Sequence, residues 1–229
     1  MKVLTRRFDW MGDAIPGEQN TRIVGAAPPT ATAGGGTLTL ALTAANEAQV
    51  AGWDLGDENP FPVARVLRAR FWIEMDVALS AAECSIYWGL GSDYDAVIGN
   101  IAEHVAFGIN GANDDVIVRA QDGTNTLAET EIGVLQEITD PVRKYEINLA
   151  DGIHSQSPPL AQEGGRARCG FYVSSDFGEA RRINLGAARA NISAYAGGVQ
   201  PFVKLAKTGG AGVGTASIHA IEIDYLVPN

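Results

Sequence analysis

The chain of 229 residues has few lysines, few cysteines and few histidines, and it lacks a long hydrophobic run. Its 17 basic residues stand against 27 acidic ones, which gives a formal charge of −10. Nucleic-acid binding depends on Lys and Arg that displace counterions from phosphate, so this balance argues against DNA or RNA as a partner. A membrane-spanning helix needs about 20 consecutive apolar residues, and no such run is present. We therefore expect neither a nucleic-acid partner nor a membrane partner.

The scarcity of cysteine and histidine excludes further classes. Cys84 and Cys169 are too few for a disulfide framework in a domain of this size, and we expect free thiols. The three histidines show no zinc-protease spacing and no His-x-His pair, and no Gly-x-Ser-x-Gly occurs. The first residues carry charge but no following apolar stretch of a secretory signal. We expect the product to stay in the cytoplasm where it is made, unless a particle carries it out.

What the sequence does contain is alternation of apolar and polar residues with a period of two. In residues 67–79, Phe71, Ile73 and Met75 belong to an apolar series, while Trp72 and Glu74 belong to the intervening polar one. On a helix these residues would scatter around the axis, whereas in a strand they separate onto two faces. This pattern predicts a long strand with one buried face.

The same alternation returns along the chain, punctuated by Gly, Asn and Asp that favour tight turns. Residues 151–165 and 207–215 are loop-like, and only residues 44–51 have a helix-forming composition. About ten strands without crossover helices predict an all-β fold, a two-sheet antiparallel β-sandwich. Beyond 67–79, the expected strands are 37–42, 85–90, 105–109, 116–120, 145–149, 169–173, 183–185, 199–207 and 218–227.

The first 36 residues differ in composition from the rest, because residues 25–36 are rich in Gly, Pro, Ala and Thr. We expect an extended N-terminal arm over 1–36 and a single sandwich domain over 37–229. The arm would be either a long surface loop or a segment that orders against a neighbouring subunit. In the second case its contacts would come from five side chains, namely Arg6, Arg7, Phe8, Trp10 and Met11.

Candidate site residues cluster on the polar side of the long strand. Glu74 and Asp76 would lie about 7 Å apart on one strand face, which suits paired carboxylates, and Trp72 on the same face would suit sugar stacking. The alternative is that these acids are solvated charges on an exposed strand face. Calcium is a second expectation to test, because residues 110–115 hold two Asn and two Asp, although a hairpin turn that uses these residues for backbone reasons is the favoured explanation. No other cofactor is expected.

The two ends and the middle of the chain resemble one family. Residues 200–205 (QPFVKL), a Gly-rich turn at 209–214 and residues 217–226 (SIHAIEIDYL) resemble the closing hairpin of concanavalin A-like jelly-roll proteins of tailed-bacteriophage virions. Residues 8–13 (FDWMGD) and 16–22 (PGEQNTR) are similar to the start of those chains. Residues 71–75 (FWIEM) and 87–90 (YWGL) are similar to their central strands.

This resemblance implies a structural protein of a virion. Such proteins decorate, or cement, the capsid exterior by binding the major capsid protein, so the chain would be a homotrimer without catalytic residues. Two alternatives stay open: a lectin-like module of a phage head or tail that binds a surface glycan, and a degenerate glycoside hydrolase. Laminarinase-type hydrolases carry Glu-x-Asp-x-x-Glu, but the sixth position is Leu79 after Glu74 and Val227 after Glu222.

Overall fold

A computed structural model gives the structure of the protein. It describes residues 1–12, 15, 19–56, 58–95, 97–111, 115–136, 142–149, 169–174, 181–183, 185, 190, 192 and 194–228. The predicted loop at 151–165 lies outside these ranges. Within them, no helix is long and apolar enough to cross a membrane.

The strands form two antiparallel sheets, which we call sheet A and sheet B. Sheet A has the order β14(Arg181–Arg182), β13(Gly170–Ser174), β12(Arg143–Asn148), β7(Val66–Val77), β16(Thr215–Val227), β4(Thr37–Ala41), β3(Thr30–Gly34), with β1(Lys2–Phe8) also on β16. Sheet B has the order β11(Thr126–Leu135), β10(Asp115–Asp122), β9(Glu103–Asn110), β8(Cys84–Gly91), β15(Gly198–Lys207), β5(Gln49–Asp54), β2(Asn20–Val24), with β6(Phe61–Pro62) on β15. Two short 3-10 helices complete the described elements, η1(Val63–Arg65) and η2(Ile98–Asn100).

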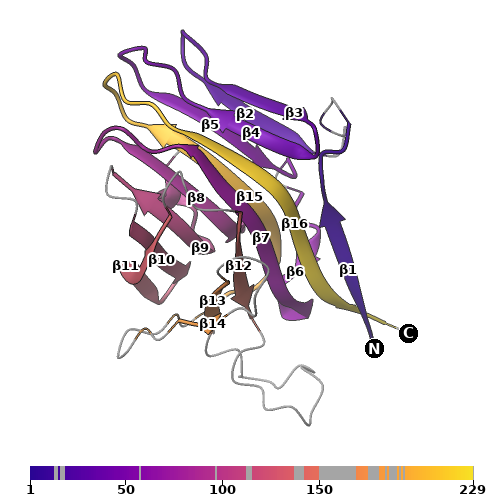
Figure 1. The fold of residues 1–229 in the computed structure, drawn as a ribbon. Helices are drawn as coiled ribbons and strands as arrows, with labels where there is room; N and C mark the ends of the chain where they lie inside the picture. The colour runs from indigo at the N-terminus through magenta and orange to yellow at the C-terminus, as the bar shows by residue number, and fades with distance from the viewer. Residues whose placement is uncertain are drawn as a thin grey trace.

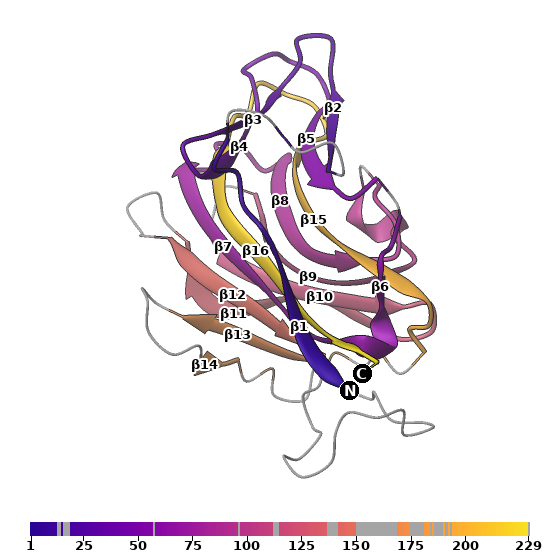
Figure 2. The ribbon, with the colours of Figure 1, turned by 90° about the vertical axis from the view of Figure 1, so that its right-hand side faces the viewer.

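The two sheets stack face to face as a sandwich (Figure 1). The long strands β7, β8, β15 and β16 curve along their length, and the two termini lie side by side at one end (Figure 2). This architecture confirms the predicted all-β fold with two antiparallel sheets.

The core between the sheets is formed by the apolar series of each strand. Phe71 and Ile73 of β7 are fully buried, and so are Trp88 of β8 and Phe107 of β9 in the facing sheet. The Phe107 ring lies 5.1 Å from the Phe171 ring of β13, in an edge-on contact that joins the sheets. Each such side chain contributes about 1.5–3 kcal/mol by leaving water. In β7 alternation therefore positions the opposite, polar face outward, whereas β5, β8, β9 and β15 are buried on both faces.

The expectation of a separate N-terminal arm is wrong for the described residues. β1 and β3 extend sheet A, and β2 pairs with β5 in sheet B. Phe8 and Trp10 are 2% and 1% exposed, and both rings contact Trp53 edge-on, at 5.5 and 5.6 Å between centroids. The side-chain oxygen of Gln19 accepts hydrogen bonds from both indole N–H groups, Trp10 Nε1 and Trp53 Nε1. The segment is held within its own chain because its aromatic residues complete the core.

The structure bears on four smaller expectations. The helix-like composition of 44–51 does not form a helix, since β5 begins at Gln49. Ile183 and Leu185 are not in a strand, whereas the adjacent Arg181 and Arg182 form β14. Residues 208–214 form the turn expected between the last two strands, and both cysteines are buried thiols, as predicted.

Candidate functional site

A row of mostly charged side chains crosses sheet A on its outward face, and we call this surface the ladder face. Register places six residues of six neighbouring strands opposite one another. Facing residues of adjacent strands have Cβ atoms about 4.5–5.5 Å apart, so their side chains interact. In order across the sheet, the row is Arg182, Tyr172, Glu146, Arg70, Glu222 and Arg7.

Arg70 is the centre of this row. Its Nε lies 3.2 Å from Glu146 Oε2, its Nη1 lies 2.8 Å from Glu222 Oε2, and its Nη2 lies 2.7 Å from Asp224 Oδ2. Glu222 also pairs with Arg7, at 2.6 Å. A guanidinium can do this because its N–H donors are arranged in a fixed planar fork. The part of the row from Glu146 to Arg7 is therefore a set of pre-formed ion pairs.

Asp224 is the most buried acid of the ladder face. It accepts hydrogen bonds from Thr5 Oγ1 at 2.6 Å and from Arg68 Nε at 2.5 Å, besides the contact with Arg70. Burial opposes its ionisation, but the hydrogen bonds from Thr5 and Arg68 and the charge of Arg70 outweigh this, so the pKa of Asp224 lies below its ordinary value. An acid held ionised in this way cannot serve as a proton donor at neutral pH.

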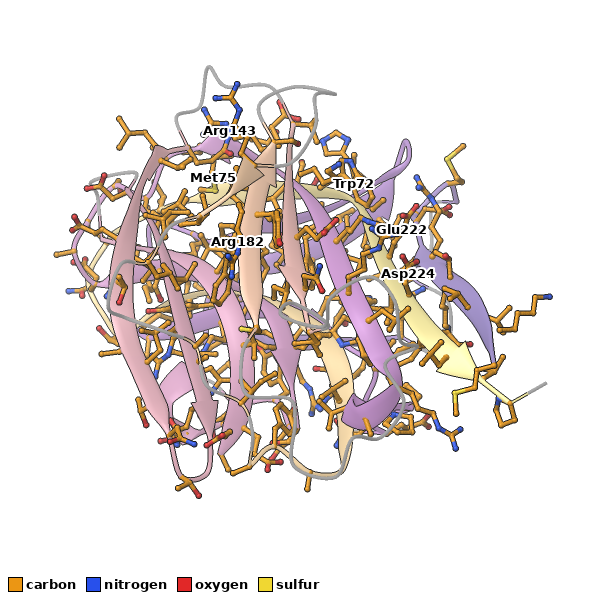
Figure 3. The ribbon with its side chains drawn as sticks, turned by 90° about the horizontal axis from the view of Figure 1, so that it is seen from below. Trp72, Met75, Arg143, Arg182, Glu222 and Asp224 are labelled. Carbon is orange, nitrogen blue, oxygen red and sulfur yellow. The ribbon has the colours of Figure 1, made fainter. Side chains whose placement is uncertain are left out.

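The predicted site residues of the long strand do share this face. Figure 3 shows Trp72 near Glu222 and Asp224, with Arg182 across the sheet from them. Trp72 is half-buried, and the guanidinium of Arg7 lies 5.9 Å from its ring centre. Glu74 Oε2 is 2.9 Å from His219 Nε2, and Asp76 accepts a hydrogen bond from Ser217 at 2.7 Å. Both acids are thus engaged with neighbours on β16.

The outward strand residues of the ladder face carry no net formal charge, although the chain carries −10. Asp9, just beyond β1, adds one acid at 3.4 Å from Arg7. Lys144 lies on the ladder face opposite Trp72, and the outward residues of the described strands balance in number. The five basic residues are Arg7, Arg68, Arg70, Lys144 and Arg182, and the five acidic ones are Glu74, Asp76, Glu146, Glu222 and Asp224. The excess acid of the sequence therefore comes from residues outside this set.

The five partner-contact candidates of the N-terminal segment divide into three groups. Phe8 and Trp10 are in the core, so the prediction that they anchor on another subunit is wrong. Arg6 stacks over the Phe8 ring at 5.0 Å, and Arg7 belongs to the ladder face. Met11 is 79% exposed and remains accessible to a partner.

The outward face of sheet B carries a second polar cluster, which the sequence patterns did not reveal. Glu129 of β11 accepts hydrogen bonds from Tyr87 Oη at 2.6 Å, Asn110 Nδ2 at 3.1 Å and Arg119 Nη1 at 3.2 Å. Arg119 Nε also donates to His104 Nε2 at 3.0 Å. These residues come from four strands, and only their alternate positions in β8 to β11 hinted at a shared face.

Two buried basic side chains, His104 and Lys204, lie beneath the loop between β8 and β9. Burial lowers the pKa of His104 to about 4, so the imidazole is neutral at physiological pH. Burial also lowers the pKa of Lys204 to about 8. Lys204 Nζ donates to the carbonyl of Asp95 at 3.2 Å and lies 5.6 Å from the Tyr87 ring. Two apolar residues of the loop, Ile98 and Ile101, form a small apolar cluster with residues that include Tyr87 and Phe202.

In the part of the chain that the structure describes, the carboxyl groups of both clusters already have hydrogen-bond or ion-pair partners. On the ladder face the acids are bound to Arg, His or Ser, and in the sheet B cluster Glu129 is the single carboxylate that the three donors hold. Among the described residues, no three His, Cys, Asp or Glu side chains are placed to hold a metal ion. Of the residues weighed for calcium, Asn113 and Asp114 lie outside the described ranges.

Fold and topology define the chain as a concanavalin A-like jelly roll, the architecture of lectins and glucanases. No family model matches the sequence, and no curated protein matches it. Among solved structures, a laminarinase from Flavobacterium sp. UMI-01 is 12% identical, with a TM-score of 0.63, covering 98% of this chain and 100% of that one.

Two further structures extend the comparison. Crh5 transglycosylase in complex with NAG is 11% identical, with a TM-score of 0.61, covering 98% of this chain and 85% of that one. The Ca²⁺/Man3GlcNAc-bound exoplasmic domain of VIP36 is 8% identical, with a TM-score of 0.52, covering 93% and 85%. At these identities the similarity establishes the fold.

Proposed function

We propose that the protein is a non-catalytic binding protein that decorates the exterior of a tailed-phage head and stabilises it through the ladder face. One observation carries the proposal: the ladder face is neutral and ion-paired on an otherwise acidic chain. The sequence resemblance at both ends and in the middle of the chain supports the virion assignment.

The chemistry of the ladder face suits a protein partner. Arg, Trp and Tyr dominate the energetics of protein interfaces, and the face presents several Arg with Trp72 and Tyr172. Side chains already fixed by ion pairs lose little freedom on binding, which favours affinity. The acidic remainder repels other acidic surfaces, so the neutral face is the one that can approach them closely.

Decoration requires affinity for an assembled lattice and no chemistry. A protein that binds the expanded shell at many symmetry-related sites stabilises it by mass action. The major capsid protein is the proposed partner, and a homotrimer at threefold positions would match the symmetry of the shell. The mature location would then be the capsid exterior of a particle assembled in the host cytoplasm.

Charge reversal tests this proposal on purified heads of the phage that encodes the chain. Lys144→Glu and Arg182→Glu alter the ladder face on strands β12 and β14, whereas Arg65→Glu alters exposed η1 as a matched control. We expect each ladder variant to lower occupancy on heads by roughly tenfold or more and the control to bind as wild type. Absence of the protein from purified particles would refute the proposal, as would equal binding of all variants.

A glycan is the second candidate ligand, because Trp72 is accessible on the same face beside polar groups. Similar folds act on or bind sugars: a laminarinase, a transglycosylase in complex with NAG, and VIP36 bound to Man3GlcNAc. The probes are a β-1,3-glucan, chito-oligosaccharides and mannose-rich glycans, each with and without Ca²⁺. Binding that Trp72→Ala abolishes would support this candidate. Absence of binding to every probe, with and without Ca²⁺, would refute it.

A further inference from the structure

The side chain of Lys207, at the end of β15, is buried among backbone carbonyl groups. It is 2% exposed, and four carbonyl oxygens lie within hydrogen-bond distance of its ammonium. These belong to Thr43 at 2.7 Å, Ala45 at 2.5 Å, Gly210 at 3.1 Å and Gly212 at 3.1 Å. All four acceptors are uncharged carbonyl oxygens, and the carboxylate of Glu47 also attracts the ammonium electrostatically.

This arrangement is that of a cation site. An ammonium has three N–H donors, yet four oxygens surround Nζ, so at least one of them is held by attraction to the charge. Rings of backbone carbonyls replace the hydration shell of a monovalent cation in other proteins.

Backbone geometry holds the oxygens in place. Gly210 has a φ of 71°, and a Cβ there would lie 2.0 Å from Glu83 Oε1. A Cβ on Gly212 would lie 2.5 Å from the Cys84 sulfur. Glycine is therefore required at both positions for the turn to direct its carbonyl groups toward Lys207.

The cage joins three connections at one end of the sandwich, where Figures 1 and 2 both show them together. Thr43 and Ala45 belong to the β4–β5 connection, and Gly210 and Gly212 to the β15–β16 turn. Gln49 Nε2 donates to the carbonyl of Ala27 at 2.7 Å, and this bond links the β2–β3 connection to the start of β5. Without a positive charge at its centre, the converging carbonyl dipoles would repel one another.

We propose that this cage is a binding site for a small monovalent cation, and that the chain fills it with its own Lys207 ammonium. Truncation of the side chain would open the site to free ammonium, methylammonium or K⁺. The tethered cation thus fixes the three connections irrespective of the ions in solution.

Chemical rescue of Lys207→Ala tests the proposal. We expect the variant to lose on the order of 10 °C in Tm, because four buried acceptors lose their donor. Ammonium, methylammonium or K⁺ should then raise its Tm by on the order of 5 °C at about a hundred times its Kd, whereas tetramethylammonium, too large for the cage, should not. Lys207→Met, which fills the space with apolar atoms, should show no such rescue.

Wild-type protein provides the second measurement, which needs no truncated variant. The chain has four lysines, so ¹⁵N spectra of their ammonium groups are simple. We expect the Lys207 Nζ protons to exchange slowly with water and to give a resolved signal at neutral pH, which exposed Lys2 does not give. Rescue that is no larger than with tetramethylammonium would overturn the proposal, and so would fast exchange at Lys207.

Discussion

Replacing Arg70 by Met removes the residue that joins three carboxylates on the ladder face. Glu146 and Asp224 are only 8% and 3% exposed, so the substitution leaves buried negative charge without its counter-ion. Breaking a buried ion pair costs about 3–5 kcal/mol. Asp224 keeps Arg68 and Glu222 keeps Arg7, and the cluster is partly hydrated, so we expect Arg70→Met to cost roughly 2–4 kcal/mol.

Urea unfolding at pH 7 measures this loss. Arg65→Met, on exposed η1, is the matched control and should stay within about 0.5 kcal/mol of wild type. The discriminating variant is Glu146→Gln in the Arg70→Met background, because it removes the stranded charge. We expect the double variant to recover about 1 kcal/mol relative to Arg70→Met, although Glu146→Gln alone destabilises wild type.

Additive effects of the two substitutions would refute this reasoning. The same conclusion would follow if Arg70→Met cost less than about 0.5 kcal/mol, since the ion pairs would then behave as ordinary surface pairs.

Three further predictions concern other parts of the molecule. Because the folded-state pKa of His104 is about 4 and its unfolded value about 6.5, only the unfolded state binds the proton between these pH values. Stability should therefore fall by about 3 kcal/mol as the pH is lowered from 6.5 to 4, and His104→Gln should remove that part of the pH dependence in urea unfolding. Gly89→Ala should cost about 1–3 kcal/mol, since its Cβ would lie 2.2 Å from the Val105 carbonyl, whereas Gly12→Ala, with nothing within 4 Å, should be nearly neutral. Any glucan hydrolysis found in a purified sample should be unchanged in Glu74→Gln, and its loss would restore the hydrolase interpretation.

Alternation predicted the central strands well because one buried face determines both the period and the orientation of a strand. The N-terminal segment has the composition of a linker, which predicts an extended arm. Its contribution to the core depends on contacts among Trp10, Gln19 and Trp53. Trp10 and Trp53 meet at Gln19 only when β1 and β2 join different sheets. Nothing in the spacing of these residues along the chain indicates that contact.

The candidate site was foreseen in part for a similar reason. The positions of Trp72, Glu74 and Asp76 on one face follow from parity within a single strand. The ladder itself depends on register among six strands, and a shift of one residue would break every pair. The Lys207 cage depends on loop carbonyl groups, whose positions cannot be predicted from the pattern of side chains.

Lysine footprinting on purified phage heads tests the central claim most directly. Lys204 and Lys207 are buried, Lys2 is exposed, and Lys144 lies on the ladder face opposite Trp72. We predict that amine-reactive labelling of Lys144 falls at least severalfold on the particle relative to the free protein, and that it falls more than labelling of Lys2. Equal labelling of Lys144 in the two states would contradict the assignment of the ladder face as the binding surface.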